Sequence, residues 1–137
     1  MSCSFCAIVR GEVDAHVVYE DDGFLAFLDH RPLFAGHALL VPREHVETVW
    51  DAPPELLSGL ALATQRLSVA VRDAMEAEGV FNAVNNVVSQ SVPHLHVHVV
   101  PRRRKDGLRG FFWPRTKYAS DAEAHEVATR ILRLTQP

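Results

Sequence analysis

At 137 residues, with 47% hydrophobic and 23% charged side chains, the chain has the size and composition of one domain that folds without disulfides. Fourteen Lys and Arg against seventeen Asp and Glu give a formal charge of -3, which favours neither nucleic acid nor an anionic membrane as a partner. The start of the chain lacks the basic and apolar regions of a secretory signal, and Val80 to Pro101, its longest uncharged stretch, is too polar to span a membrane. We therefore expect a cytoplasmic protein with a single domain, residues 1–137.

Three strands are predicted in the first third of the chain. Val17–Tyr19 and Phe24–Leu28 are β-rich runs separated by Asp-Asp-Gly, whose residue types suit a tight turn and indicate a hairpin. His37–Val41 is a third strand, and the proline that follows it lacks the N–H that a further ladder bond needs. A short helix is predicted over Glu44–Trp50.

A long amphipathic helix follows, opened by Pro53 and Pro54 and ended by Gly79. Its apolar side chains recur at spacings of three and four: Leu56, Leu60, Ala63, Leu67, Ala70 or Val71, and Ala74. Such a helix is roughly 37 Å long, enough to cover a small sheet.

The remaining elements are two strands and a last helix. Val80–Val84 and His94–Val100 are strand candidates, and Ser120–Leu134 has an N-cap residue and helical spacing of its apolar side chains. The class is therefore α+β, with a mainly antiparallel five-stranded sheet covered by one long helix.

The most informative segment runs from Gln90 to Pro101, because it contains histidines 94, 96 and 98 in strict alternation with apolar residues. On a strand the three imidazoles would share one face, while Leu95, Val97 and Val99 would be buried on the other. A single histidine on a strand is usually a surface or hydrogen-bonded residue, but three in alternation indicate a function. A three-histidine metal site is disfavoured, since the outer two would lie about 13 Å apart along an extended strand.

Cys3 and Cys6 form a second candidate site. Two cysteines separated by two residues, with no secretion signal, indicate a metal half-site or a redox pair before a disulfide. No strand precedes Cys3, which disfavours a thioredoxin-like redox motif.

Residues 94–100 read His, apolar, His, apolar, His, apolar, apolar, which resembles the signature of the histidine-triad (HIT) nucleotide hydrolases and transferases, in their bacterial Hint-like branch. The likeness extends over nearly the whole chain, through Cys3-Ser4-Phe5-Cys6, Ala26-Phe27-Leu28-Asp29, Gly36–Pro42, His45, Asn85 and Trp113. Val99-Val100-Pro101-Arg102 is also similar to the Fhit-like dinucleoside polyphosphate hydrolases. The resemblance implies a HIT-like fold, with short N-terminal and C-terminal helices, and a homodimer.

The resemblance also implies a mechanism. Neutral His96 would attack the α-phosphorus and form a nucleotidyl-histidine that water releases. A main-chain carbonyl near His94 would select the tautomer whose outward nitrogen attacks. The phosphate oxygens would be hydrogen-bonded by His98, Asn85, Gln90 and Ser91.

Asp29 would hold the ribose hydroxyls by the same resemblance, although it could also be a turn residue. An apolar slot for the base would be formed by Phe5, Ile8, Val13 and Phe27, any of which could equally belong to the core.

Bacterial members of the family imply a structural zinc held by Cys3, Cys6, His45 and His94, with no open position for water and no organic cofactor. The alternative is a reduced pair of cysteines without metal.

One departure from the family lies in the loop before Gln90. The family has a glycine-rich loop there, whereas this chain has Asn86-Val87-Val88-Ser89, which is two residues shorter and has stiff, bulky valines in place of glycines. Arg102–Lys105 could contact distal phosphates, but such a run is usually a solvated loop. The role of His37 stays open.

The function that these features predict is a nucleotide phosphoramidase or nucleotidyl hydrolase, acting on a purine nucleoside monophosphate joined to an amine or a phosphate chain. The alternatives are a Fhit-like dinucleoside polyphosphate hydrolase, a non-catalytic AMP-binding protein, and a metal-dependent hydrolase. The preferred base and the leaving group are not determined by these motifs.

Overall fold

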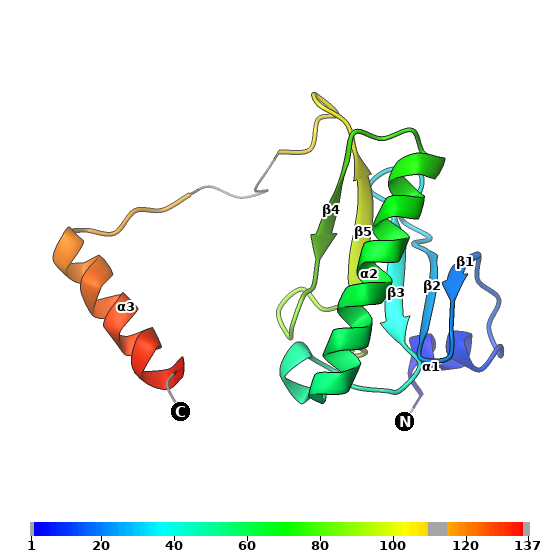
Figure 1. Cartoon of the computed structure of the whole chain (residues 1–137), viewed down its shortest axis with the longest axis horizontal. Coiled ribbons are helices and arrows are strands. Elements are labelled where there is room, and N and C mark those ends of the chain that lie inside the picture. The colour runs from blue at the N-terminus through cyan, green and yellow to red at the C-terminus, as the bar shows by residue number, and fades with distance from the viewer. Residues whose placement is uncertain (1, 110–114, 136–137) are drawn as a thin grey trace. The chain divides into compact units, whose positions relative to one another are not determined.

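The structure is a computed structural model that describes residues 2–109 and 115–135, so Trp113 lies outside the described residues. The chain divides into two compact units, Met1–Asp106 and Gly107–Pro137. The first unit contains a sheet and two helices, and the second contains one helix (Figure 1).

The sheet has five strands in the order β1-β2-β3-β5-β4, and every neighbouring pair is antiparallel. The strands are β1 (Val17–Glu20), β2 (Phe24–Leu28), β3 (Ala38–Pro42), β4 (Gly79–Ala83) and β5 (Val97–Arg102). The predicted hairpin is β1 and β2, and its turn is held by Asp21, whose carboxylate accepts the N–H groups of Gly23 and Phe24 at 2.9 and 2.8 Å. The predicted α+β class with a five-stranded antiparallel sheet is confirmed.

One face of the sheet is covered by α2 (Pro54–Ala74), which Figure 1 shows in green in front of the strands. The apolar stripe of α2 packs against alternate residues of the sheet, as period-2 strands and a period-3.6 helix require. The buried members of this core are Leu60, Ala63, Leu67 and Val71 from the helix, and Phe24, Ala26, Ala38, Leu40, Leu95, Val97 and Val99 from the strands and the segment before β5.

The long helix ends at Ala74, five residues before the predicted end at Gly79. Glu76 has a φ of 51°, and the N–H groups of Glu76 and Ala77 donate to the carbonyls of Asp73 and Arg72. This is the hydrogen-bond pattern of a Schellman motif, here with glutamate rather than glycine in the left-handed position. Gly79 instead begins β4, which pairs with β5.

The opposite face of the sheet receives α1 (Ser4–Val9), a helix of six residues. Phe5 is buried there against residues of β2 and β3, namely Leu25, Phe27, Leu39 and Val41. Cys3 caps the helix, because its sulfur accepts the N–H of Cys6 at 3.4 Å. A helix this short has little stability of its own, so these contacts hold it in place.

Two further sequence predictions about local structure are wrong. Glu44–Trp50 is not a helix, and only a 3₁₀ turn, Val49–Asp51, forms there, closed by a capping box between Thr48 and Asp51. The last strand begins at Val97 rather than at His94, because the N–H of Leu95 donates to the carbonyl of Val46 at 2.7 Å instead of joining the sheet.

The second unit contains α3 (Asp121–Thr135), which confirms the predicted C-terminal helix. Ser120 caps it by accepting the N–H of Glu123 at 3.1 Å. None of the helices in the described part of the chain combines the length and the apolar character that a membrane span requires.

Truncating the buried face of α2 should destabilise the fold. Leu67 is 1% exposed, so Leu67→Ala should lower the free energy of unfolding by about 2–5 kcal/mol, through lost burial and the cavity left behind. Leu62, 55% exposed on the same helix, is the matched control, and Leu62→Ala should cost less than about 1 kcal/mol. Urea unfolding of both variants checks this, and equal losses would mean that α2 buries a different face.

Candidate active site

The three histidines of the triad segment are placed by the segment that leads into β5. Only His98 lies within the strand, and His94 and His96 precede it. Leu95 and Val97 are nevertheless buried under α2, as the alternation predicted. His96 and His98 lie side by side on the opposite face, with ring centroids 5.1 Å apart.

His96 is held in one tautomer by the backbone. It is 3% exposed, and its Nδ1–H donates to the carbonyl oxygen of His94 at 2.7 Å. The proton is therefore on Nδ1, and Nε2 keeps its lone pair. The ring is also packed edge-on against Phe5, with centroids 5.1 Å apart at 89°. The carbonyl expected from the resemblance is thus in place, and this hydrogen bond leaves the lone pair of Nε2 free.

His98 is held in a defined tautomer by His37, whose role the sequence leaves open. The N–H of Leu33 donates to Nδ1 of His37 at 3.0 Å, so the proton of neutral His37 is on Nε2. That Nε2–H lies 3.0 Å from Nδ1 of His98 and donates to it. Neutral His98 therefore carries its own proton on Nε2, where it serves as a hydrogen-bond donor. Asp29 supports His37, since its Oδ2 lies 3.6 Å from His37 Nε2.

Burial keeps His98 neutral. It lowers the pKa of His98 from 6.5 to about 4, with smaller contributions in the same direction from His96 and His37, and the carboxylate of Asp29 opposes the shift. Burial also lowers the pKa of His37, again opposed by Asp29. At neutral pH the pair is therefore an uncharged relay of hydrogen bonds.

A cavity of about 620 Å³ opens beside His96 and His98. It is also lined by six other residues to which the sequence assigned roles: Phe5, Ile8, Val13, Phe27, Asp29 and Ser91. The sequence had given no role to the others that line it, which are Ser4, Asp14, Ala15, His16, Leu28, His30, Leu39 and Val92. The structure thus brings the predicted base slot, the predicted ribose carboxylate and two of the three triad histidines, His96 and His98, to one cavity. Asn85 and Gln90 are not among its lining residues.

The shortened loop before Gln90 has the left-handed backbone conformation that glycine favours, although the loop contains no glycine. Val87 and Ser89 have φ angles of 71° and 64°, a left-handed conformation that costs a non-glycine residue about 1–2 kcal/mol. The side chain of Gln90 offsets this cost by accepting the N–H of Val87 and donating to the carbonyl of Glu47. The N–H of Val88 donates to the carbonyl of Asn86. The N–H groups of both valines are therefore used within the loop.

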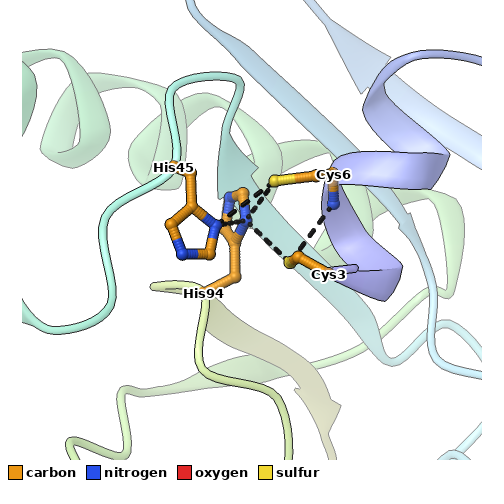
Figure 2. Close-up of side chains that lie close together, drawn as sticks. All are labelled: Cys3, Cys6, His45 and His94. Carbon is orange, nitrogen blue, oxygen red and sulfur yellow. Dashed lines mark hydrogen bonds between the residues drawn. The ribbon is translucent and has the colours of Figure 1, made fainter. Parts of the chain in front are cut away.

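The four predicted metal ligands meet at the start of α1, as Figure 2 shows. Nδ1 of His94 lies 3.5 Å from the sulfur of Cys3, 3.5 Å from that of Cys6 and 3.2 Å from Nδ1 of His45. The Cys6 sulfur also lies 3.2 Å from Nδ1 of His45. Ligands at ordinary Zn–S and Zn–N lengths on a tetrahedron stand roughly 3.5 Å apart, so the spacing suits zinc.

The protonation states fit a metal as well. Nε2–H of His94 donates to the carbonyl of Pro42 at 2.8 Å, which leaves the Nδ1 lone pair facing the cluster. Burial lowers the pKa of His94 and raises that of the Cys6 thiol, with Cys3 raising the latter further. A bound cation would instead lower the pKa of the Cys6 thiol, since metal-bound cysteine is a thiolate.

A second group of possible ligands, Asp29, His37 and His98, also lies close together. Its hydrogen bonds do not suit a metal. His37 Nδ1 is occupied by the Leu33 N–H, so a metal on Nε2 would require His37 to lose its only proton. The structure favours a hydrogen-bond relay at this group.

Comparison with known proteins agrees with this arrangement. The HIT domain family matches residues 10–105, which is more than half of the chain. The chain belongs to the HIT family. An uncharacterised HIT-like protein of Mycobacterium tuberculosis is 42% identical over 110 residues, which cover 79% of this chain and 76% of that protein. The yeast adenosine 5'-monophosphoramidase HNT1, of Saccharomyces cerevisiae, is 32% identical over 108 residues, covering 78% of this chain and 67% of the enzyme.

Two solved HIT structures match nearly the whole chain. A HIT family protein of Bacillus subtilis superposes with a TM-score of 0.89 at 31% identity, covering 100% of this chain and 99% of its own. A zinc-bound histidine-triad protein of Mycobacterium smegmatis superposes with a TM-score of 0.75 at 38% identity, covering 98% and 96%. The fold of this HIT protein is therefore that of its family.

The neutral state of His98 should be visible in the pH dependence of stability. As pH falls from 6.5 towards about 4, unfolded His98 takes up a proton and native His98 does not, so the free energy of unfolding should decrease across that window. His37 adds a contribution of the same sign. His98→Asn should reduce this slope, and His125→Asn, at an exposed position of α3, should not. Urea unfolding between pH 4 and 7 measures the slope, and nitrogen NMR that finds His98 charged at pH 6 would contradict the assignment.

Proposed function

We propose that this HIT protein is a nucleotide phosphoramidase or nucleotidyl hydrolase, acting on a purine nucleoside monophosphate joined to an amine or a phosphate chain. The observation that carries the proposal is the hydrogen bond from His96 Nδ1–H to the His94 carbonyl, beside a cavity large enough for a nucleotide. It is supported by the yeast relative, which is named an adenosine 5'-monophosphoramidase.

In the first step, the lone pair of His96 Nε2 forms a bond to the α-phosphorus. The bond from phosphorus to the leaving nitrogen or oxygen breaks, and the leaving group takes that electron pair and a proton from solvent. In the second step, water attacks the phosphorus and gives up a proton to solvent, the bond from phosphorus to Nε2 breaks with its electron pair returning to Nε2, and the nucleoside monophosphate is released. The first step needs Nε2 unprotonated, and the His94 carbonyl favours that tautomer by accepting the Nδ1–H.

We assign the other side chains by what they offer to the parts of such a substrate. The Nε2–H of His98 donates to a phosphate oxygen, and it does so from a neutral ring whose tautomer His37 fixes. Ser91 lines the cavity beside them and is a second phosphate donor. Asn85 and Gln90, which the sequence also predicts to bind phosphate, do not line the cavity, and the Gln90 amide bonds to Val87 and Glu47. Asp29 accepts the ribose hydroxyls, and the apolar slot holds the base: Phe5, Ile8, Val13 and Phe27.

We further propose that Cys3, Cys6, His45 and His94 hold one structural zinc ion. The proposal is supported by the spacing of the four ligand atoms, by the tautomer of His94, and by the zinc-bound relative from Mycobacterium smegmatis. Four protein ligands leave no position for water, so the ion would act by fixing the protein. Its effect on chemistry would be indirect, because His94 supplies the carbonyl that holds His96.

The covalent intermediate can be tested directly. Wild-type protein mixed with adenosine 5'-phosphoramidate should gain the mass of one nucleotidyl group, which His96→Ala should not. The turnover of His96→Ala should fall by about 1,000-fold or more, because no second nucleophile replaces Nε2. Intact-protein mass spectrometry after rapid quenching and steady-state kinetics check both points.

The same experiment separates the alternatives. Equal binding of AMP by the two proteins, with no labelling and no turnover of any phosphoramidate, would overturn catalysis and leave a nucleotide-binding protein. Cleavage of diadenosine tri- or tetraphosphate in preference to the phosphoramidate would instead place the enzyme with the dinucleoside polyphosphate hydrolases.

The zinc proposal predicts one zinc per chain by elemental analysis and a loss of stability when it is removed. Binding to the native state alone contributes about 4 kcal/mol when free zinc is 1,000-fold above its Kd, so chelation or Cys6→Ser should lower the melting temperature markedly. His125→Ala, which removes an imidazole from α3, should keep its zinc and serves as the control. If chelation abolishes activity at once while the melting temperature is unchanged, the metal is catalytic and the structural role is wrong.

A further inference from the structure

A carboxylate lines the cavity beside the proposed base slot, although an apolar slot requires no charged group. Asp14 lines the cavity together with Phe5, Val13 and Phe27, which form the proposed base slot. Its segment, between α1 and β1, is fixed on both sides. The N–H of Glu12 donates to the carbonyl of Ala7, and the carbonyl of His16 accepts the N–H of Leu28, each at 2.9 Å. Asp14 is therefore held next to the strand that carries Phe27.

The carboxylate of Asp14 is available to a ligand. Among the described residues it has no hydrogen bond or ion pair within the protein, and it is exposed to solvent at the cavity. The other carboxylate of the cavity, that of Asp29, is already engaged, since its Oδ1 accepts the N–H of Arg31 at 2.9 Å and its Oδ2 faces His37. Asp29 also has the ribose as its proposed partner.

A carboxylate distinguishes guanine from adenine, because an ionised carboxylate can only accept hydrogen bonds. The Watson–Crick edge of guanine presents two adjacent donors, N1–H and the N2 amino group. The same edge of adenine presents one donor, the N6 amino group, beside an acceptor, N1, which repels a carboxylate oxygen. The other polar residues that line the cavity without a proposed role, Ser4, His16 and His30, can donate or accept and so do not choose between the bases.

We propose that Asp14 is a specificity-determining residue that makes this enzyme prefer guanine nucleotides over adenine nucleotides. The inference rests on the proposed function, since it requires that the base occupy the slot around Phe5 and Phe27. The two carboxylate oxygens accept N1–H and N2–H of guanine, while the rings stack on the apolar walls. The substrate class is then a guanosine 5'-monophosphate joined to an amine or a phosphate chain.

The test compares kcat/KM for the 5'-phosphoramidates of guanosine, inosine and adenosine. Inosine keeps N1–H and lacks the N2 amino group, so it isolates the second hydrogen bond. We expect the wild type to prefer guanosine over adenosine by about tenfold, with inosine between them, as a hydrogen-bonded pair with one charged partner implies. Asp14→Ala should reduce that ratio to about twofold or less, since the remaining slot is apolar.

A conservative variant gives a sharper result. The amide of Asn presents one acceptor and one donor, which matches the N6 amino group and N1 of adenine. Asp14→Asn should therefore shift the preference towards adenosine, a change that a merely structural role for Asp14 would not produce. Asp22→Ala is the matched control, because it removes the same charge from an exposed turn outside the cavity, and its guanosine-to-adenosine ratio should equal that of the wild type.

Failure of this inference differs from failure of the proposed function. Equal kcat/KM for guanosine and adenosine in the wild type, or a guanosine preference that survives in Asp14→Ala, overturns the role of Asp14 and leaves the nucleotidyl chemistry intact. If no phosphoramidate is cleaved, the proposed function fails, and calorimetry with GMP, IMP and AMP decides the inference. Tighter GMP binding that Asp14→Ala abolishes supports it, and equal or absent binding overturns it.

Discussion

The site depends on the position of one backbone group, the carbonyl of His94, because it holds the proton of His96 on Nδ1. The contacts of the His94 side chain fix the position of that carbonyl. The ring of His94 is fully buried, donates to the carbonyl of Pro42 at the end of β3, and turns its other nitrogen to Cys3, Cys6 and His45. In the proposed mechanism, the reactive nitrogen of His96 is thus prepared by a residue that does not touch the substrate.

Hydrogen bonds from the backbone assign a different protonation pattern to each histidine around the cavity. A carbonyl places the proton of His96 on Nδ1, whereas the Leu33 N–H places that of His37 on Nε2, and His37 in turn orients His98. The chemistry of an imidazole depends on which nitrogen carries the proton, so in the proposed mechanism the same side chain serves as a nucleophile, a relay or a donor. The three proposed roles therefore rest on one residue type in three hydrogen-bonding environments.

Much of the fold follows from periodicity in the sequence. The stripe of α2 and the alternation around Leu95 and Val97 predict which residues are buried. The same alternation predicts that the imidazoles lie on the opposite face, where His96 and His98 border the cavity. The homodimer, the cytoplasmic location and the single domain remain predictions. What the sequence could not give depends on bonds between distant segments. The bond from Leu95 to Val46 delays the start of β5, and the partners of His37 and the place of Asp14 follow from contacts that leave no pattern in the sequence.

The cluster at the start of α1 also bears on how the molecule assembles. Cys3 and His94 are 91 positions apart, and His45 comes from a third segment between them. Closing so long a loop costs chain entropy that only the finished sheet can offset. A chain still emerging from the ribosome has the cavity walls of α1 and β2 long before it has the carbonyl that sets His96. The fixed tautomer of His96 is therefore among the last features of the cavity that the folding chain acquires, when its beginning meets the segment before β5.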